Sequence, residues 1–205
     1  MFALKFKANI VILKRAGYFI ILTAAITFIA TIITCIVNPD IKAVMEGIGN
    51  SAPSQIKESR GIDKVWSYIV HNGFAVPLQM FILAFVPIQF LYLANIISTS
   101  SLLGVFFGVA LQASLDKGFE LIISSISHSV LELFAYCLLA AVLFELNQVI
   151  RTKMINLVKK DRERDSFIKK ILKVTRTYLA FVLPLIILAA LLETYAADMI
   201  LHLLR

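Results

Sequence analysis

The sequence predicts an all-α protein, a polytopic transmembrane helix bundle of about five spans. Sixty per cent of the 205 residues are hydrophobic and the mean hydropathy is +0.87, values above those of ordinary soluble domains. Uncharged stretches of about 20 residues or more recur along the chain, and that length is needed to cross the hydrocarbon core of a bilayer. We therefore expect residues 1–205 to form a single integral membrane domain.

The five expected spans come from four apolar segments, because one segment is long enough for two crossings. The segments are 18–37, 73–115, 121–146 and 177–201. The first span should stay as an anchor, since its apolar length exceeds that of a signal peptide and no A-x-A cleavage site follows it. Pro77 and Pro87 should kink the second span.

The connection between the second and third spans depends on one polar run, Asn95–Ser101 (NIISTSS). This run is the polar stretch available for a turn within the long uncharged region, so we expect the chain to reverse there. The remaining third segment, 96–113, is then short. That length leaves a re-entrant hairpin open as an alternative to a full crossing.

Lysines and arginines are distributed unevenly among the polar segments. Residues 1–16 carry four basic residues and no acid, residues 149–176 carry ten basic and three acidic residues, and residues 38–72 carry four of each. The positive-inside rule places the first two segments in the cytoplasm and the third outside. The chain should therefore lie in the cytoplasmic membrane, with its N-terminus inside and, after five crossings, its C-terminus outside.

These polar segments also have expected structures. Residues 1–16 should form an amphipathic cytoplasmic helix, residues 38–72 an external loop, and residues 149–176 a basic helical hairpin on anionic lipid headgroups. The lipid bilayer is thus an expected partner. Nucleic acid is not, because no aromatic side chains alternate with the charges of residues 149–176.

Ionisable residues inside the apolar segments are the candidate functional residues. A carboxylate in hydrocarbon costs at least about 2.5 kcal/mol, so Glu132 should face a protein interior or a wet cavity. His128, Glu132 and Tyr136 recur every four residues and share one helical stripe. Glu193 lies in the fifth segment. Other polar residues expected in the same outer half are His71, Asn72, Asp198 and His202. Together they suggest a polar chamber open to the outside.

A catalytic interpretation assigns roles to these residues. Glu132 would activate a water or an amine, His128 would polarise a carbonyl or shuttle a proton, and Glu193 or Asn95 would complete the site. The residues expected to contact a substrate or partner are His71, Asn72, Asn95, Tyr136, Asp198 and His202.

A structural interpretation is equally open. Glu132 would neutralise His128 or bond a serine on a neighbouring helix, and Glu145 would reach the cytoplasmic surface near Arg151. No metal or cofactor is expected, because His128-x-x-x-Glu132 lacks the second histidine of a metalloprotease helix.

Other recognisable patterns point to packing. Cys35 and Cys137 lie in apolar segments without the spacing of a metal site or a redox pair. Gly104-x-x-x-Gly108 has the spacing that lets two membrane helices approach closely.

Several motifs resemble those of the stage II sporulation protein M family, multi-pass membrane proteins of bacteria and archaea. Ser127–Leu133 (SHSVLEL) aligns with the family's Pro-His-Gly-x-x-Glu-Leu segment, with Ser127 and Ser129 in place of the proline and glycine. The other matching positions, in the expected order, are His71-Asn72, Asn95 followed by the run to Gly104-x-x-x-Gly108, and Leu192-Glu193-Thr194-Tyr195. Asn95 is followed by Ile96 where the family often has glycine. The resemblance covers roughly residues 65–200.

The resemblance implies two kinds of role. Members act in a membrane complex with cell-wall hydrolases during sporulation, and close relatives occur in gene sets for circular bacteriocins, where they serve in maturation, export or protection. We therefore expect a non-enzymatic component that handles a hydrophobic peptide or binds other envelope membrane proteins, and a homo-oligomer remains open. The alternative is an intramembrane peptidase or peptide-cyclising enzyme that uses Glu132 and His128.

Overall fold

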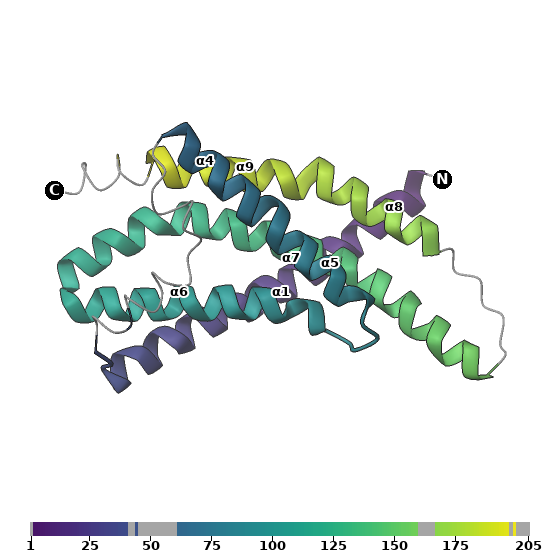
Figure 1. The fold of residues 1–205 in the computed structure, drawn as a ribbon, viewed down its shortest axis with the longest axis horizontal. Coiled ribbons are helices and arrows are strands. Elements are labelled where there is room, and N and C mark those ends of the chain that lie inside the picture. The colour runs from purple at the N-terminus through teal and green to yellow at the C-terminus, as the bar shows by residue number, and fades with distance from the viewer. Residues whose placement is uncertain (1, 41–43, 45–60, 160–166, 197–198, 200–205) are drawn as a thin grey trace.

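The computed structural model confirms the all-α prediction and describes residues 2–40, 44, 61–159, 167–196 and 199. Five helices in this part of the chain are long and apolar enough to cross a membrane. They pack side by side as a bundle (Figure 1). The described elements are α1 (Phe2–Val37), α4 (Ile62–Tyr68), η1 (Ile69–Ala75), α5 (Val76–Phe85), η2 (Leu91–Leu93), α6 (Ala94–Ala113), α7 (Leu115–Lys159), α8 (Phe167–Thr177), η3 (Tyr178–Val182), α9 (Leu183–Leu191) and η4 (Leu192–Ala196).

Helix α7 forms the centre of the bundle. It packs against α1, α5, α6, α8 and α9, and every side chain from Ala135 to Leu143 is buried. Small residues within this stretch, such as Ala140 and Ala141, let neighbouring helices approach its backbone. The remaining spans surround α7 and expose many large apolar side chains on their outer faces.

Helices α1 and α6 make the closest pair, and the predicted packing role of Gly104 and Gly108 is confirmed. A Cβ atom on Gly104 would collide with the backbone oxygen of Thr27. Hydroxyl groups of α1 use the same close approach: Thr27 Oγ1 donates to the Ser100 carbonyl and Thr31 Oγ1 to the Gly104 carbonyl, both at 3.1 Å. The contact therefore combines small residues with interhelical hydrogen bonds.

The turn between the second and third spans lies at residues 86–90, so the predicted turn at Asn95–Ser101 is wrong. Val86 is extended because it precedes Pro87, and this ends α5. Asn147 of α7 then donates to the carbonyls of Ala84, at 2.9 Å, and Val86, at 2.8 Å.

The third span is consequently complete. Residues 91–113 form a helical segment long and apolar enough to cross the membrane, which removes the re-entrant hairpin as an alternative. The polar residues of the run 95–101 lie inside α6, where the backbone of Ser100 serves the contact with α1.

Pro77 and Pro184 each lie just after a π-helical turn, η1 and η3 respectively. The backbone at η1 shows how the structure accommodates the proline. Val76 N–H donates to the His71 carbonyl, five residues back, so the Asn72 carbonyl loses its α-helical donor. Pro77 has no N–H for the Gly73 carbonyl. Tyrosine hydroxyls bond both carbonyls: Tyr136 donates to Asn72 at 3.0 Å and Tyr178 donates to Gly73 at 2.6 Å.

Helix boundaries differ from the expected segments in three places. The second span begins at Ile62, so the last part of the predicted loop 38–72 is already helical. Residues 2–16 form the first turns of the continuous helix α1. The basic segment 149–176 includes the end of α7 and all of α8 except its last residue, and residues 160–166 between them lie outside the described part.

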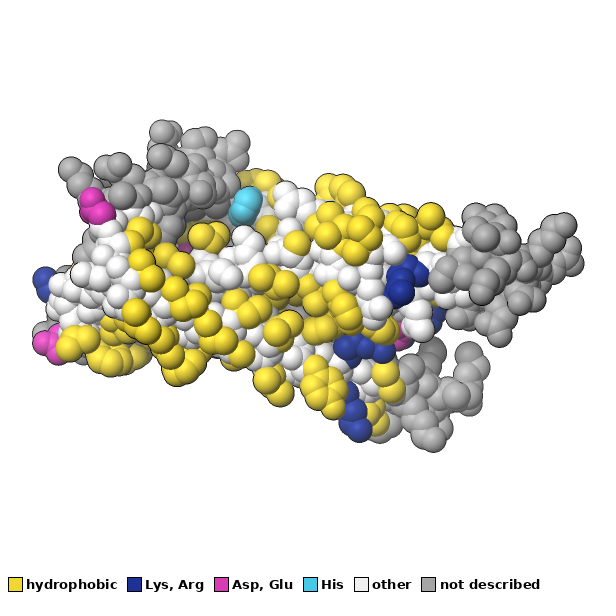
Figure 2. Space-filling view, turned by 90° about the horizontal axis from the view of Figure 1, so that it is seen from below, with side chains coloured by type: hydrophobic (Ala, Val, Ile, Leu, Met, Phe, Trp, Pro, Cys, Tyr) yellow, Lys and Arg dark blue, Asp and Glu magenta, His cyan; other side chains and the backbone are white. Residues whose placement is uncertain are grey.

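The outer surface matches a protein immersed in lipid. Figure 2 shows hydrophobic side chains over the middle of one face, with lysines and arginines gathered toward one end of the bundle. We call this the basic end and define it by Arg15, Glu145, Lys170 and Lys173.

Candidate functional site

A polar cavity of about 240 Å³ lies between α4–η1, α6, α7 and η4. We call it the polar cavity. Its lining residues are Tyr68, Asn72, Thr99, Leu102, Leu103, Phe106, His128, Ser129, Glu132, Leu133 and Glu193. His128, Glu132 and Glu193 thus lie around one space, as the sequence led us to expect. Their chemical roles remain predictions.

The polar cavity lies far from the basic end. Glu132 and Glu145 belong to the same helix and are separated by thirteen residues, about 20 Å at 1.5 Å per residue. That distance is about two thirds of a 30 Å hydrocarbon core. Glu132 is therefore well inside the bundle, nearer the end at which α4 begins.

Each cavity carboxylate has a tyrosine beside it. The Tyr68 hydroxyl of α4 interacts with Glu193 of η4, and the Tyr136 hydroxyl interacts with Glu132 one turn earlier on α7. Tyr136 has a single hydroxyl proton, which it donates to the Asn72 carbonyl. This arrangement links Glu132 to the π-helical turn η1.

His128 lines the polar cavity, and one of its ring nitrogens has no hydrogen-bond partner among the described residues. Its Nδ1 atom is buried and has no hydrogen-bond partner in the described structure. Among the interactions of the described residues, no hydrogen bond or ion pair joins His128 to Glu132, so the expected neutralising contact is not made. Within the described structure, Nδ1 is thus a buried polar atom without a partner, on a residue that lines the cavity.

A lysine lies at the edge of the same group. Lys64 Nζ is 5.8 Å from the centre of the Tyr68 ring, and its charge acts on both His128 and Glu193. Within the described residues it forms no salt bridge of 4.0 Å or less with either cavity carboxylate. The two acids are thus without a direct cationic partner there.

The other predicted contact residues are dispersed. Asn95 lies outside the polar cavity, where its amide nitrogen donates to Gln79 Oε1 at 3.0 Å. His71 is half-buried next to the cavity residue Asn72 but does not line the cavity. Asp198 and His202 lie outside the described residues.

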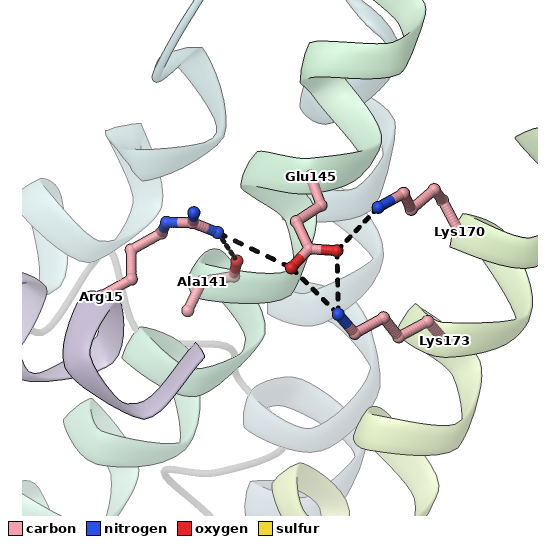
Figure 3. Close-up of polar contacts among 5 residues, drawn as sticks. All are labelled: Arg15, Ala141, Glu145, Lys170 and Lys173. Carbon is pink, nitrogen blue, oxygen red and sulfur yellow. Dashed lines mark hydrogen bonds and ion pairs between the residues drawn. The ribbon is translucent and has the colours of Figure 1, made fainter. Parts of the chain in front are cut away.

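The prediction that Glu145 lies near Arg151 at the surface is wrong, because Glu145 contacts lysines of α8. Glu145 pairs with Lys170 at 3.0 Å and Lys173 at 2.8 Å, with Arg15 at 4.0 Å (Figure 3). Arg151 instead donates to Gln89 Oε1 at 2.6 Å, which helps to fix the turn 86–90. Glu145 lies six residues before Arg151 on α7, and its nearest cations come from α8 rather than from α7 itself.

Sequence reasoning missed Lys64 and Tyr68 as site residues. With Asn72 they recur every four residues, the same spacing that identified the stripe on α7. The sequence predicts an external loop over residues 38–72, and that prediction hides this helical stripe. Trp66, two residues before Tyr68, is exposed, as suits an aromatic residue at a membrane interface.

An apolar groove of about 440 Å³ adjoins the polar cavity. It runs between α1, α6 and α7, and exposed side chains such as Phe28 and Val130 place it on the outer surface. Leu103, Ser129 and Leu133 line both spaces. We call it the lipid-facing groove, and its common wall with the polar cavity joins an apolar surface to a charged interior.

Among the described residues, the ionisable side chains of the polar cavity do not form a metal site. In the part of the chain that the structure describes, no three His, Cys, Asp or Glu side chains are close enough together to hold one. The available chemistry is therefore that of two carboxylates, an imidazole and hydroxyl groups facing a small space.

Five apolar helices that are long enough to cross a bilayer, packed as a bundle with a polar cavity between them, define a multi-pass membrane protein. The family model described as stage II sporulation protein M matches residues 14–198, and the chain belongs to that family. Comparisons with curated proteins and with solved structures found no match.

Proposed function

We propose that this protein is a non-enzymatic component of the cytoplasmic membrane that holds a hydrophobic peptide carrying a cationic group. The apolar part of the peptide would lie in the lipid-facing groove and its cation in the polar cavity. The observation that carries this proposal is the common wall of the two spaces, Leu103, Ser129 and Leu133. A peptide with both properties can occupy both spaces without crossing the bundle.

Charge complementarity supports the cationic part of this peptide. Glu132 and Glu193 face the polar cavity without a salt bridge to a described residue. Burying a carboxylate without a partner is costly in a membrane, so a bound ammonium or guanidinium would relieve that cost. Lys64 near the edge of the cavity would moderate the attraction and let the peptide leave.

The family gives this proposal its biological setting. A circular bacteriocin is one hydrophobic peptide of this kind, and the role would then be its maturation, export or a protective capture. Partner binding during cell-envelope remodelling would use the same groove for the membrane helix of another protein. In either setting we place the N-terminus in the cytoplasm, because the basic end carries the positive-inside charges.

A photocrosslinking experiment in lipid discs tests the proposal. A synthetic apolar helix with one lysine near its end is the probe, and an otherwise identical helix with glutamine there is its comparison. A photoreactive residue at position 103 should capture the lysine probe, whereas one at the exposed position 181 should not. Replacing both acids, Glu132→Gln with Glu193→Gln, should abolish the preference for lysine. The proposal would be refuted if positions 103 and 181 captured the lysine probe equally, or if position 103 captured the lysine and glutamine probes equally.

An intramembrane peptidase or peptide-cyclising enzyme is the second candidate. The observation in its favour is that His128, Glu132 and Glu193 line one cavity and His128 Nδ1 is unpaired. Glu132 would take a proton from water or from a peptide amine as that group attacks the carbonyl, and His128 would deliver a proton to the departing amine. Turnover of a peptide by the purified protein distinguishes this candidate from simple binding.

A further inference from the structure

The three cations around Glu145 carry more charge than that carboxylate can neutralise. Lys170 and Lys173 reach it from α8 and Arg15 from α1, with α7 between them (Figure 3). Three positive charges against one negative charge leave a net charge of +2 at this junction. About a quarter of each cationic side chain stays exposed, 23% for Arg15, 29% for Lys170 and 28% for Lys173.

Hydrogen-bond donors are also left over. Arg15 has five N–H groups, and one nitrogen donates to the Ala141 carbonyl at 2.9 Å while the guanidinium lies 4.0 Å from the Phe144 ring centre. Lys170 has three donors and gives one hydrogen bond to Glu145. Donors with residual positive charge are the usual recognition elements for a phosphate group.

The surroundings fit the rest of a lipid. Helices α1 and α8 each pack against α7, and the guanidinium and the two ammonium groups meet over α7 between them. Leu22 is seven residues beyond Arg15, on the same face of α1 and two turns deeper in the span, and it is exposed. Headgroup contacts at the basic end would thus continue directly into an apolar surface for acyl chains.

We propose that the junction of Arg15, Lys170 and Lys173 over Glu145 binds the phosphate of an anionic phospholipid. The lipid phosphate bonds the free donors of the three cations, and its chains lie along α1. Basic pockets between transmembrane helices are known to suit such headgroups. This site is separate from the polar cavity and does not depend on the peptide proposed above.

Native mass spectrometry of the purified full chain in detergent tests the site. Phosphatidylglycerol and phosphatidylcholine with identical acyl chains are compared, and only the anionic lipid should be retained. Arg15→Gln and Lys170→Gln should each weaken its retention about fivefold, from roughly 1 kcal/mol per cation near a lipid phosphate. Lys14→Gln is the matched control: Lys14 is the exposed neighbour of Arg15, and it should leave retention unchanged.

Two further measurements separate the possible outcomes. Glu145→Gln raises the net charge and should retain the lipid at least as well as the unchanged chain, whereas a merely structural ion cluster would give no anionic preference. Glycerol 3-phosphate should not displace the lipid. Equal retention of both lipids, an equal loss in Lys14→Gln, or displacement by glycerol 3-phosphate would overturn the assignment. Thermal unfolding of each variant identifies any loss of fold. Lys170→Gln should fold normally, because Arg15 and Lys173 still neutralise Glu145.

Discussion

Asn147 is a polar side chain in the core whose structural role is defined by two hydrogen bonds. Replacing it with leucine leaves the Ala84 and Val86 carbonyls without their donor at the end of α5. An unsatisfied buried polar group costs about 1–3 kcal/mol, so Asn147→Leu should lower the free energy of unfolding by at least that amount. Thermal unfolding in lipid discs measures this, and Gln148→Leu at an exposed neighbouring position should have little effect. Equal stability of the two variants would contradict the role of Asn147.

Glu132 separates the two candidate functions. Glu132→Gln keeps the shape and most hydrogen bonding, so a binding role should tolerate it better than Glu132→Leu. A general base would instead lose turnover by roughly a hundredfold or more in the glutamine variant, although the protein folds and inserts normally. The assay is processing of a hydrophobic peptide by the purified protein in lipid discs, with unfolding followed in parallel. Normal processing by the glutamine variant would exclude Glu132 as the base.

At the residue scale, the sequence revealed the acids but not their partners. The cost of a charge in hydrocarbon singles out Glu132 and Glu193 from the sequence alone. Tyr68 and Lys64 meet them only because the second span begins at Ile62 and passes beside η4. A tyrosine near a membrane boundary fits the interface as well as a cavity, so sequence spacing alone does not decide between the two.

Helix pairs are the scale at which glycine acts in this protein. Gly104→Ala adds a Cβ atom against the Thr27 backbone, which cannot move without separating α1 from α6. Overpacking of this kind costs about 1–3 kcal/mol, so we expect a clear drop in the unfolding temperature. Gly17→Ala is the control, since nothing lies within 4 Å of its added Cβ. A Gly104→Ala variant as stable as Gly17→Ala would show that the two helices are not in this close contact.

The π-helical turn η1 gives a prediction about coupling. Tyr178→Phe removes the donor to the Gly73 carbonyl, which Pro77 cannot supply, and should destabilise the protein by about 1–3 kcal/mol. Pro77→Ala restores a backbone N–H near that carbonyl, so the same tyrosine change should cost less in its presence. A double-mutant cycle measures the difference. Strictly additive effects would mean that Tyr178 does not compensate for the proline.

At the element scale, the number of spans was predictable and the position of one turn was not. The polar run 95–101 favoured a loop because serine, threonine and asparagine are common in turns. In a membrane, however, small polar residues also suit helix–helix contacts, and here they begin α6. Val86-Pro87 was the better signal, since a residue before proline leaves the helical conformation.

For the whole molecule, the charge distribution predicts one orientation. In a background with Cys35→Ser and Cys137→Ala, single cysteines at Asp63 and Asp116 should react with a membrane-impermeant maleimide in intact cells. A cysteine at Lys169 should react only after the cells are opened. All three positions are exposed, so the comparison reports sidedness rather than burial. Reaction at position 169 in intact cells would invert the topology and place the polar cavity nearer the cytoplasm.

The central position of α7 has a consequence for how the chain is made. The spans emerge from the ribosome in chain order, so α1, α5 and α6 enter the membrane before α7, the helix that contributes more buried side chains than any other described helix. Until then α1 and α6 can already associate through Thr27, Thr31 and Gly104, because that contact does not need α7. The interface of α5 with the core stays open to lipid or the insertion machinery. The core of the bundle therefore forms only once the fourth span has entered the membrane.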